Sequence, residues 1–358
     1  MLTYRPQLDS LRAVAVLPVL AAHFWLPDLE LSSLGVRLFF VLSGFLLTTI
    51  LLADRHIAES RQVARSLVLR DFYARRILRI WPAYYATLIA ALFLGAGSVA
   101  ATFGWHALFA SNILFYLQQQ WSPGLTAHLW TLAVEEQFYL VLPLVVLFLP
   151  RKSLLPLLSA CIAGAILYRA LAAATVTGAL DFYFVLPIAQ LDALGAGGVL
   201  ALLGSDLQAR LWKALLLWSL PVAAAAYLAP LPAAVEFAVA HAVYLLPMIA
   251  LVAGAASGIG GPLGAVLSNR AIVGLGRISY GVYLYHIFVA AALNKLVRSF
   301  TGAELWGTPA AFALHTVATI AVASASWFVL ERPALKLKRF VRGAAGGVTP
   351  IPASPTRA

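Results

Sequence analysis

Runs of apolar residues, each about twenty residues long, recur along most of this 358-residue chain. A helix needs roughly 20 such residues to cross a bilayer core of about 30 Å. Hydrophobic residues make up 62% of the sequence and charged residues 11%, which excludes an ordinary soluble domain. The sequence therefore predicts an all-α fold, a polytopic membrane helix bundle with about ten transmembrane helices. We expect these spans at about 8–26, 35–53, 79–97, 128–149, 153–172, 181–203, 211–229, 235–254, 277–298 and 309–331, and an interfacial helix at 103–117.

The basic residues predict that both termini lie in the cytoplasm, because cytoplasmic loops of membrane proteins collect Lys and Arg. With the N-terminus inside, the loops that follow the even-numbered spans hold most of them, for example 53–76. The loop 98–127 on the other side holds none, and only Lys295 and Arg298 oppose the pattern. The net charge of +11 then mostly reflects topology in a cytoplasmic (inner) membrane. We expect the lipid bilayer as a partner and no nucleic acid.

The chain divides into a transmembrane domain over 1–340 and a tail over 341–358. The tail is rich in Gly, Ala and Pro, a composition typical of disorder. We expect it to lie in the cytoplasm.

The first span carries Arg12 and His23, eleven positions apart. At 100° per residue these side chains fall within about 20° of the same helix face, roughly 16 Å apart along the axis. A charge in hydrocarbon costs at least a few kcal/mol, so such residues usually face a bundle interior or a watery cavity. Alternatively, Arg12 snorkels to the cytoplasmic surface with Asp9 as its partner, and His23 is hydrogen-bonded at the outer boundary. Together on one face, the two residues favour a lined cavity.

The fourth span repeats this design with His128 and Glu135, seven positions apart on one face, and Glu136 about 100° away. These glutamates lie in the outer half of the membrane, at a depth comparable to His23. A carboxylate near an imidazole orients the ring and raises its basicity, as a general base requires. The alternative is that each glutamate is buried and satisfied by a donor from another span.

A third polar stripe runs along the ninth span, where Ser279, Tyr283 and His286 recur at i, i+4 and i+7. These polar residues could serve only in helix packing, and this explanation accounts for the stripe as well as a role in a site does. His286 is expected near mid-membrane.

Three arginines, Arg75, Arg76 and Arg79, fall within about one turn at the start of the third span. Anchoring at the membrane surface is one explanation. However, a helix N-terminus itself favours anions, and guanidinium groups bind phosphate well. The cluster therefore predicts a phosphate-binding site.

Six segments of the chain resemble the acyltransferase-3 family of membrane acyltransferases, in the family's order and over residues 7 to about 340. The segments are LDSLRAVAVLPVLAAHF, GVRLFFVLSGFLLTTIL, FYARRILRIWPAYY, HLWTLAVEEQFYLVLPL, GRISYGVYLYHIFV and WFVLERPALKLKRF. The family's Arg-x10-His falls on Arg12 and His23, its Arg-x-x-Arg on Arg76 and Arg79, its Glu on Glu135 or Glu136, and its Ser-Gly on Ser43 and Gly44.

The resemblance implies transfer of an acyl group, usually acetyl, from cytoplasmic acyl-CoA to a hydroxyl of a cell-surface glycan or another acceptor. Two positions depart from the family: Gln190, where many members have Arg, and His286, which Ile follows instead of the frequent Pro. Both departures concern acceptor specificity more than reaction type. Some members carry an appended extracellular esterase-like domain, and here we expect any such partner to be a separate chain.

The residue pattern and the family resemblance together lead to one hypothesis about how the donor binds and reacts. The arginine cluster holds the phosphates of acetyl-CoA or another acyl-CoA, Arg12 marks the entry of the donor, and the pantetheine arm runs between the spans. His23, held by Glu135 or Glu136, acts as general base or as a covalent acyl relay. Acyl-CoA is then the donor substrate, and no metal is expected. The alternatives are O-acylation of a small secreted metabolite, a transporter or flippase, and a structural partner in glycan export.

Overall fold

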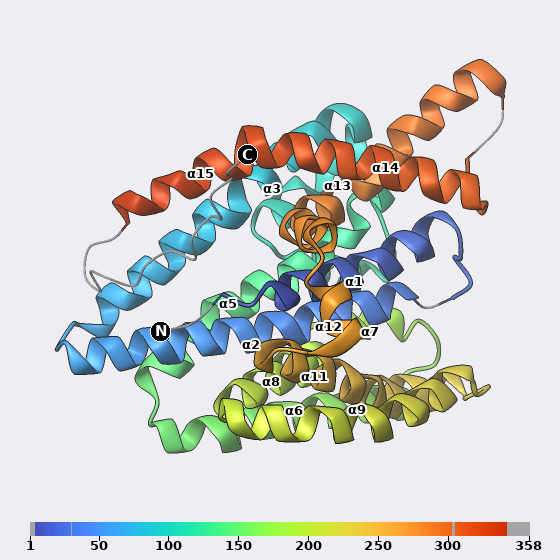
Figure 1. Ribbon diagram of the computed structural model, residues 1–358. Helices are drawn as coiled ribbons and strands as arrows, with labels where there is room; N and C mark the ends of the chain where they lie inside the picture. Colours follow the sequence, from blue (N-terminus) through green and yellow to red (C-terminus); the bar gives the residue numbers. More distant parts are fainter. Residues whose placement is uncertain (1–3, 30, 303–304, 342–358) are drawn as a thin grey trace.

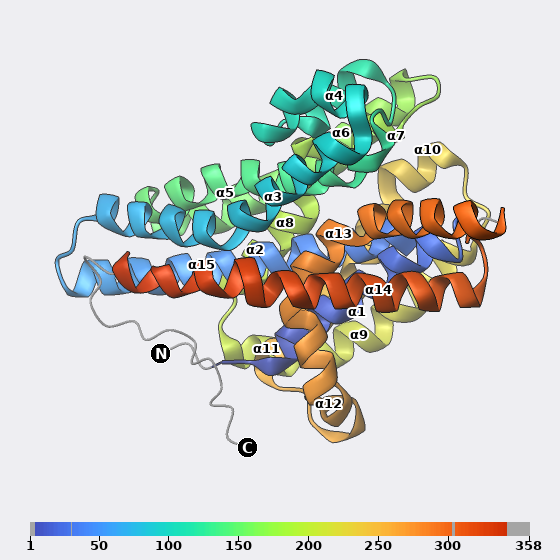
Figure 2. The same cartoon turned by 90° about the horizontal axis from the view of Figure 1, so that it is seen from above.

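The computed structural model describes residues 4–29, 31–302 and 305–341, and helices are the only regular secondary structure in them. Eight of the helical stretches are long and apolar enough to cross a membrane. The protein is thus a polytopic membrane helix bundle (Figures 1 and 2). The α-helices are α1 (Pro6–Phe24), α2 (Leu31–Ser60), α3 (Arg65–Ala107), α4 (Ser111–Gln118), α5 (Trp130–Phe148), α6 (Arg151–Thr175), α7 (Asp181–Phe184), α8 (Pro187–Leu202), α9 (Ser205–Leu228), α10 (Ala233–Val235), α11 (His241–Ser257), α12 (Gly261–Leu267), α13 (Arg270–Thr301), α14 (Pro309–Ser326) and α15 (Arg332–Lys336). Short 3₁₀ or π segments are η1 (Gly124–Leu129), η2 (Glu236–Ala240), η3 (Trp327–Glu331) and η4 (Leu337–Phe340).

Eight of the ten predicted spans lie on these eight stretches, and the other two lie on shorter helices. The first predicted span is α1, with 19 residues, and the sixth is α8, with 16 residues. A continuous helix from 181 is wrong, because Pro187 begins α8. Proline provides no backbone N–H for an earlier turn, and it pushes Leu186 into extended backbone, at φ −74° and ψ 144°. The predicted tail lies outside the described residues from 342 onward.

The single interfacial helix predicted at 103–117 is also wrong. Helix α3 continues as far as Ala107, and the chain turns before α4 begins at Ser111. Phe109 adopts a left-handed φ of 51°, which a continuous α-helix cannot contain. This segment is therefore two helices meeting at a corner, with α4 close to α7 (Figure 2).

Helix α2 runs through the middle of the bundle, between α1 and α8 (Figure 1). Glycines let α2 and α8 approach closely: a Cβ at Gly44 would meet the carbonyl of Leu194, and one at Gly197 would meet the carbonyl of Val41. Small residues are a common means of packing membrane helices. On its other side α1 packs against α13, so α1 lies inside the bundle.

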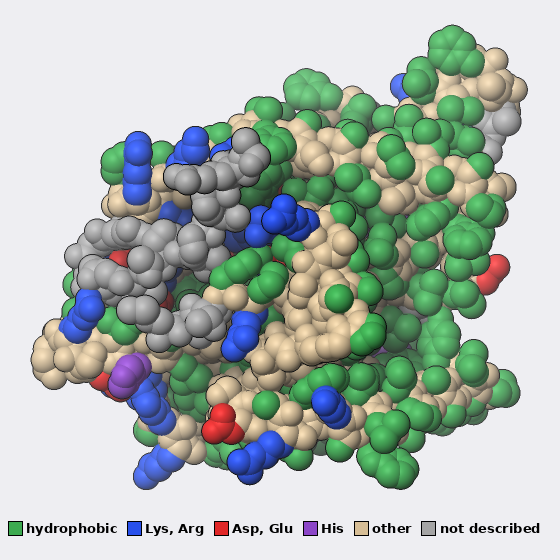
Figure 3. Space-filling model, viewed as in Figure 1, with side chains coloured by type: hydrophobic (Ala, Val, Ile, Leu, Met, Phe, Trp, Pro, Cys, Tyr) green, Lys and Arg blue, Asp and Glu red, His purple; other side chains and the backbone are tan. Residues whose placement is uncertain are grey.

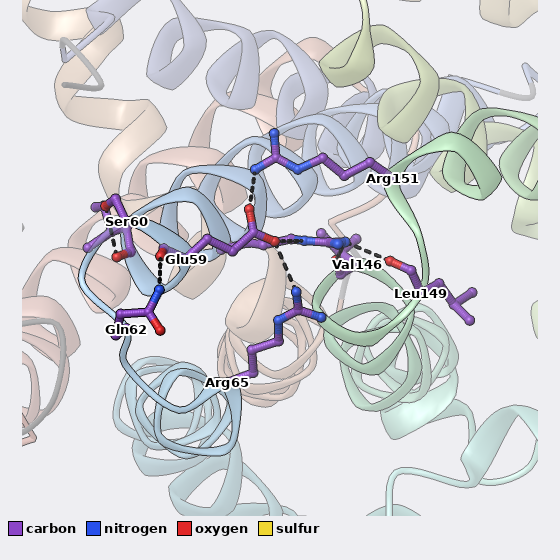
Figure 4. Close-up of polar contacts among 9 residues, drawn as sticks. Glu59, Ser60, Gln62, Arg65, Val146, Leu149 and Arg151 are labelled. Carbon is purple, nitrogen blue, oxygen red and sulfur yellow. Dashed lines mark hydrogen bonds and ion pairs between the residues drawn. The ribbon is translucent and has the colours of Figure 1, made fainter.

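Basic residues gather on the half of the molecule where the described chain ends lie, whereas hydrophobic side chains cover the other half of the same face (Figure 3). Within this basic half, Glu59 at the end of α2 pairs with Arg55, Arg65 and Arg151 at 2.8–3.0 Å (Figure 4). Arg55 also donates to the carbonyls of Val146 and Leu149, each at 2.7 Å. This network joins the ends of α2 and α5 to the starts of α3 and α6.

Candidate active site

Helix α1 connects two clusters of polar residues, with Arg12 toward one end and His23 near the other. The His23 ring is partly buried, and its Nδ1 lies 2.8 Å from the carbonyl oxygen of Val19. A carbonyl only accepts hydrogen bonds, so Nδ1 carries the proton of the neutral ring and Nε2 carries the lone pair. This tautomer leaves Nε2 available as a base or a nucleophile.

Two further histidines that the sequence placed in the candidate site, His128 and His286, lie in a row with His23. The ring centre of His286 lies 4.9 Å from that of His23 and 4.9 Å from that of His128, with edge-to-face geometry in both pairs. His286 donates from Nδ1 to the Tyr283 carbonyl at 2.6 Å, and His128 donates from Nε2 to the Leu284 carbonyl at 3.1 Å. The other two nitrogens, His286 Nε2 and His128 Nδ1, are buried without a hydrogen-bond partner among the described residues. The structure thus brings together residues from α1, η1 and α13.

Tyr283 fixes His128 in this row. The Tyr283 hydroxyl accepts a hydrogen bond of 2.8 Å from Thr131 and donates one of 3.1 Å to the carbonyl of His128. His128 belongs to the 3₁₀ segment η1, so it does not share one regular helix with Glu135 as predicted. Its place beside His286 comes from packing against α13.

The glutamates occupy a different position from the one expected. Ser43 donates a hydrogen bond of 2.6 Å to Oε1 of Glu135, and Tyr139 donates one of 3.2 Å to Ser43. Glu136 has one buried carboxylate oxygen with no partner among the described residues. The expectation that Glu135 or Glu136 holds His23 is therefore wrong in this structure, where the Val19 carbonyl fixes the ring.

Arg12, Arg76 and Arg79 form what we call the guanidinium cluster. They lie close enough that Arg76 and Arg79 each repel Arg12 electrostatically, and Arg76 stacks on the rings of Phe72 and Tyr139 at 5.5–5.6 Å. None of the ion pairs found in the described part of the chain uses any of the three arginines. Glu135 attracts two of them from beyond ion-pair distance, and three gathered guanidinium groups still favour an anionic ligand.

Arg75, the third arginine of the predicted phosphate site, differs from Arg76 and Arg79 because it pairs with Asp54 at 2.7 Å. All three arginines lie on neighbouring parts of one helix surface, because Arg75 and Arg79 are spaced i, i+4 and Arg76 and Arg79 are spaced i, i+3. Asp9 does not neutralise Arg12 either. It accepts a hydrogen bond of 2.7 Å from Tyr4 and lies 3.8 Å from Arg277.

Sequence reasoning missed a fully buried ionic group. Arg37 and Arg169 both bind Oδ2 of Asp192, at 2.7 and 2.6 Å, with side chains that are 0% exposed. Gln190, the departure from the family pattern, accepts from Arg37 at 3.1 Å and donates to the Phe184 carbonyl at 2.6 Å. The signal was present as charged residues inside apolar runs, but nothing in the sequence showed that the three charges meet.

An open cleft of about 420 Å³ lies outside the predicted spans. Its lining is neutral: hydroxyl, carboxamide and methyl groups surround it. Thr102, which lines the cleft, accepts a hydrogen bond of 3.1 Å on its carbonyl from Nδ1 of His106. His106 in turn interacts electrostatically with His128, one of the three histidines described above. The lining residues are Ser98, Ala101, Thr102, Gln118, Gln120 and Ser122.

Comparison with known proteins shows which family and which proteins this chain resembles. A family model described as an acyltransferase domain matches residues 5–328. The putative peptidoglycan O-acetyltransferase YrhL of Bacillus subtilis is 35% identical over 165 residues, which are 39% of this chain and 23% of that protein. The peptidoglycan O-acetyltransferase OatA of Listeria monocytogenes is 35% identical over 155 residues, covering 39% of this chain and 24% of that protein. The O-acetyltransferase OatA of Staphylococcus aureus is 32% identical over 164 residues, covering 42% and 26%. This chain thus matches about a quarter of the length of these relatives, and no solved structure matches it.

Proposed function

Because this chain belongs to the acyltransferase-3 family of integral membrane acyltransferases, we propose that it moves an acetyl group from acetyl-CoA to a hydroxyl of an envelope polysaccharide or glycolipid. The names of its relatives, which are O-acetyltransferases and in two cases act on peptidoglycan, support acetyl as the group and a glycan as the acceptor. The proposed location is the cytoplasmic membrane, with the donor entering from the cytoplasm.

One observation carries this proposal: a single helix bears Arg12 in an unpaired guanidinium cluster and His23 with a free Nε2, roughly 16 Å apart along its axis. The phosphates of coenzyme A are anions that suit the cluster. The uncharged pantetheine arm has a length of the same order as the separation between the two residues. A donor held at the cluster therefore delivers its thioester toward His23 while the charged nucleotide stays at the cytoplasmic side.

At His23 two routes lead to the same product. In direct transfer, Nε2 takes the proton of the acceptor hydroxyl as the oxygen attacks the thioester carbonyl. In the relay, Nε2 first attacks the thioester and then passes the acyl group to the hydroxyl. Both routes use the tautomer that the Val19 carbonyl selects.

We assign Glu135 a positioning role in this site. It attracts Arg12 and Arg76 and accepts the hydrogen bond from Ser43, so it connects the guanidinium cluster with α2. Tyr139 strengthens this connection, because its hydroxyl donates to Ser43 and its ring stacks on Arg76. Glu135 thereby supports the path between donor and base.

The open cleft near Thr102 supports the proposal that the acceptor is a glycan. Sugars present many hydroxyl groups and little charge, and the cleft offers side-chain amides from Gln118 and Gln120 with hydroxyls from Ser122 and Thr102. Such groups both donate and accept hydrogen bonds.

The test uses the purified protein in proteoliposomes with labelled acetyl-CoA and glycan fragments from the envelope. We expect label in ester linkage on the glycan and release of free coenzyme A. His23→Ala should abolish both, with folded protein retained. Substrate movement without consumption of acetyl-CoA would favour a transporter, and unchanged transfer by His23→Ala would overturn the assignment of the base.

A further inference from the structure

We propose that His286 is a second catalytic base, which takes the proton of the acceptor hydroxyl while His23 carries the acyl group. This inference rests on the proposed function and selects the relay over direct transfer. It gives a role to a buried nitrogen that direct transfer leaves unused.

His286 differs from the other buried histidines of the described chain in that its ring lies against that of His23. Its side chain is 0% exposed, and Nδ1 is already used by the Tyr283 carbonyl at 2.6 Å. Nε2 therefore holds a lone pair, buried and without a partner in the described structure. Leaving a buried polar atom unpaired costs about 1–3 kcal/mol, so such an atom in a native fold calls for an explanation.

The relay requires a base other than His23. Acylation consumes the lone pair on Nε2 of His23, while Nδ1 keeps its proton and donates it to Val19. Neither nitrogen of His23 can then accept a proton from the acceptor. The ring of His286 lies against that of His23, at 4.9 Å between centres and 74° between planes, so His286 is the base nearest to the acyl group in this proposal.

The two steps balance in atoms and charge. First, Nε2 of neutral His23 forms a bond to the thioester carbon and the C–S bond breaks, which gives an acyl-imidazolium and the thiolate of coenzyme A. Second, the acceptor oxygen bonds to the acyl carbon, its proton passes to Nε2 of His286, and the C–N bond electrons return to His23. The proton on His286 finally neutralises the thiolate, so the products are an ester and a thiol.

Burial of the second base also protects the intermediate. His286 is enclosed by the rings of His23, Phe24, His128 and Tyr283. An acyl-imidazole is readily hydrolysed, and excluding water from the base that would activate it suppresses this loss.

The experiment compares His286→Gln with wild type in proteoliposomes, using labelled acetyl-CoA and two acceptors. Hydroxylamine attacks acyl groups at neutral pH without a base, whereas a sugar hydroxyl needs one. For His286→Gln we expect wild-type labelling of His23 by donor alone, transfer to hydroxylamine within about twofold of wild type, and transfer to glycan reduced at least about 100-fold. His23→Gln should lose both transfers.

His315→Gln is the matched control. His315 is also 0% exposed, donates from Nδ1 to a carbonyl of its own helix at 2.8 Å, and has an unpaired Nε2. Its ring contacts Phe24 at 4.8 Å, one residue beyond His23. This variant should transfer to both acceptors as wild type does.

Three outcomes overturn the inference. Equal loss of both transfers in His286→Gln would indicate a structural role, and full glycan transfer would show that no second base is needed. Glycan transfer by wild type with no acyl-His23 under single-turnover conditions would establish the direct route and leave the proposed function intact. If wild type consumes no acetyl-CoA with either acceptor, the proposed function itself fails.

Discussion

The hydroxyl of Ser43 lies 2.6 Å from Oε1 of Glu135, across the contact between α2 and α5. This hydrogen bond brings the Ser-Gly segment and the glutamate segment of the chain into one site, 92 residues apart in sequence.

The Ser43–Glu135 pair predicts a graded response to substitution. Glu135→Ala should abolish transfer with little loss of folded protein, because it removes both the acceptor for Ser43 and the charge that attracts Arg12 and Arg76. Glu135→Gln still accepts from Ser43 and should retain more activity. Acetyl transfer, with size-exclusion chromatography in detergent as the folding control, measures both. If the two variants are equally inactive, the charge of Glu135 matters and the hydrogen bond does not.

The guanidinium cluster predicts that Arg76→Ala mainly raises the donor requirement. A hydrogen bond to a charged group contributes about 1.5–3 kcal/mol, so KM for acetyl-CoA should rise roughly 10- to 100-fold while kcat at saturating donor changes little. Arg75→Ala is the control, since Arg75 pairs with Asp54 and lies outside the cluster. An equal rise in both variants would mean that the surface charge of α3, and not the cluster, attracts the donor.

The network around Glu59 predicts a stability effect without an activity effect. Arg55→Ala leaves the carbonyls of Val146 and Leu149 without their donor, which should cost about 1–3 kcal/mol of unfolding free energy. Arg65→Ala removes one ion pair whose groups are 35–36% exposed and solvent-screened, and it should cost clearly less than Arg55→Ala. Thermal unfolding in detergent compares the two. Equal shifts would show that the ion pairs carry the stability and the carbonyl contacts do not.

The buried group around Asp192 predicts a severe folding defect. Asp192→Asn leaves Arg37 and Arg169 buried without a counter-charge, and breaking a buried pair in this way costs about 3–5 kcal/mol. We expect little folded protein in the membrane fraction. Asp181→Asn, at an exposed position, should accumulate normally. Normal accumulation of Asp192→Asn would imply that water reaches the two guanidinium groups.

The sequence was sufficient to predict most of the long helices, because each apolar run must find its own backbone hydrogen bonds inside a membrane. It also predicted that Arg12 and His23 share one face, since that depends on helical geometry alone. What it could not supply were pairings between distant helices. Asp54 removes Arg75 from the cluster, Ser43 takes Glu135 away from His23, and Asp192 meets Arg37 from 155 positions away. These pairings depend on how the bundle closes.

Arg12 and His23 sit on the same helix, so the distance between them cannot be adjusted without rebuilding that helix. The pantetheine arm is equally long in every acyl-CoA. Under the proposed function, a fixed spacing of this kind recognises the carrier and is indifferent to its cargo. Discrimination between acetyl and bulkier groups should then fall to His286, which borders His23, and to Phe24, which packs against His286. Enlarging the space beside those rings should widen the range of cargo while the carrier is held as before.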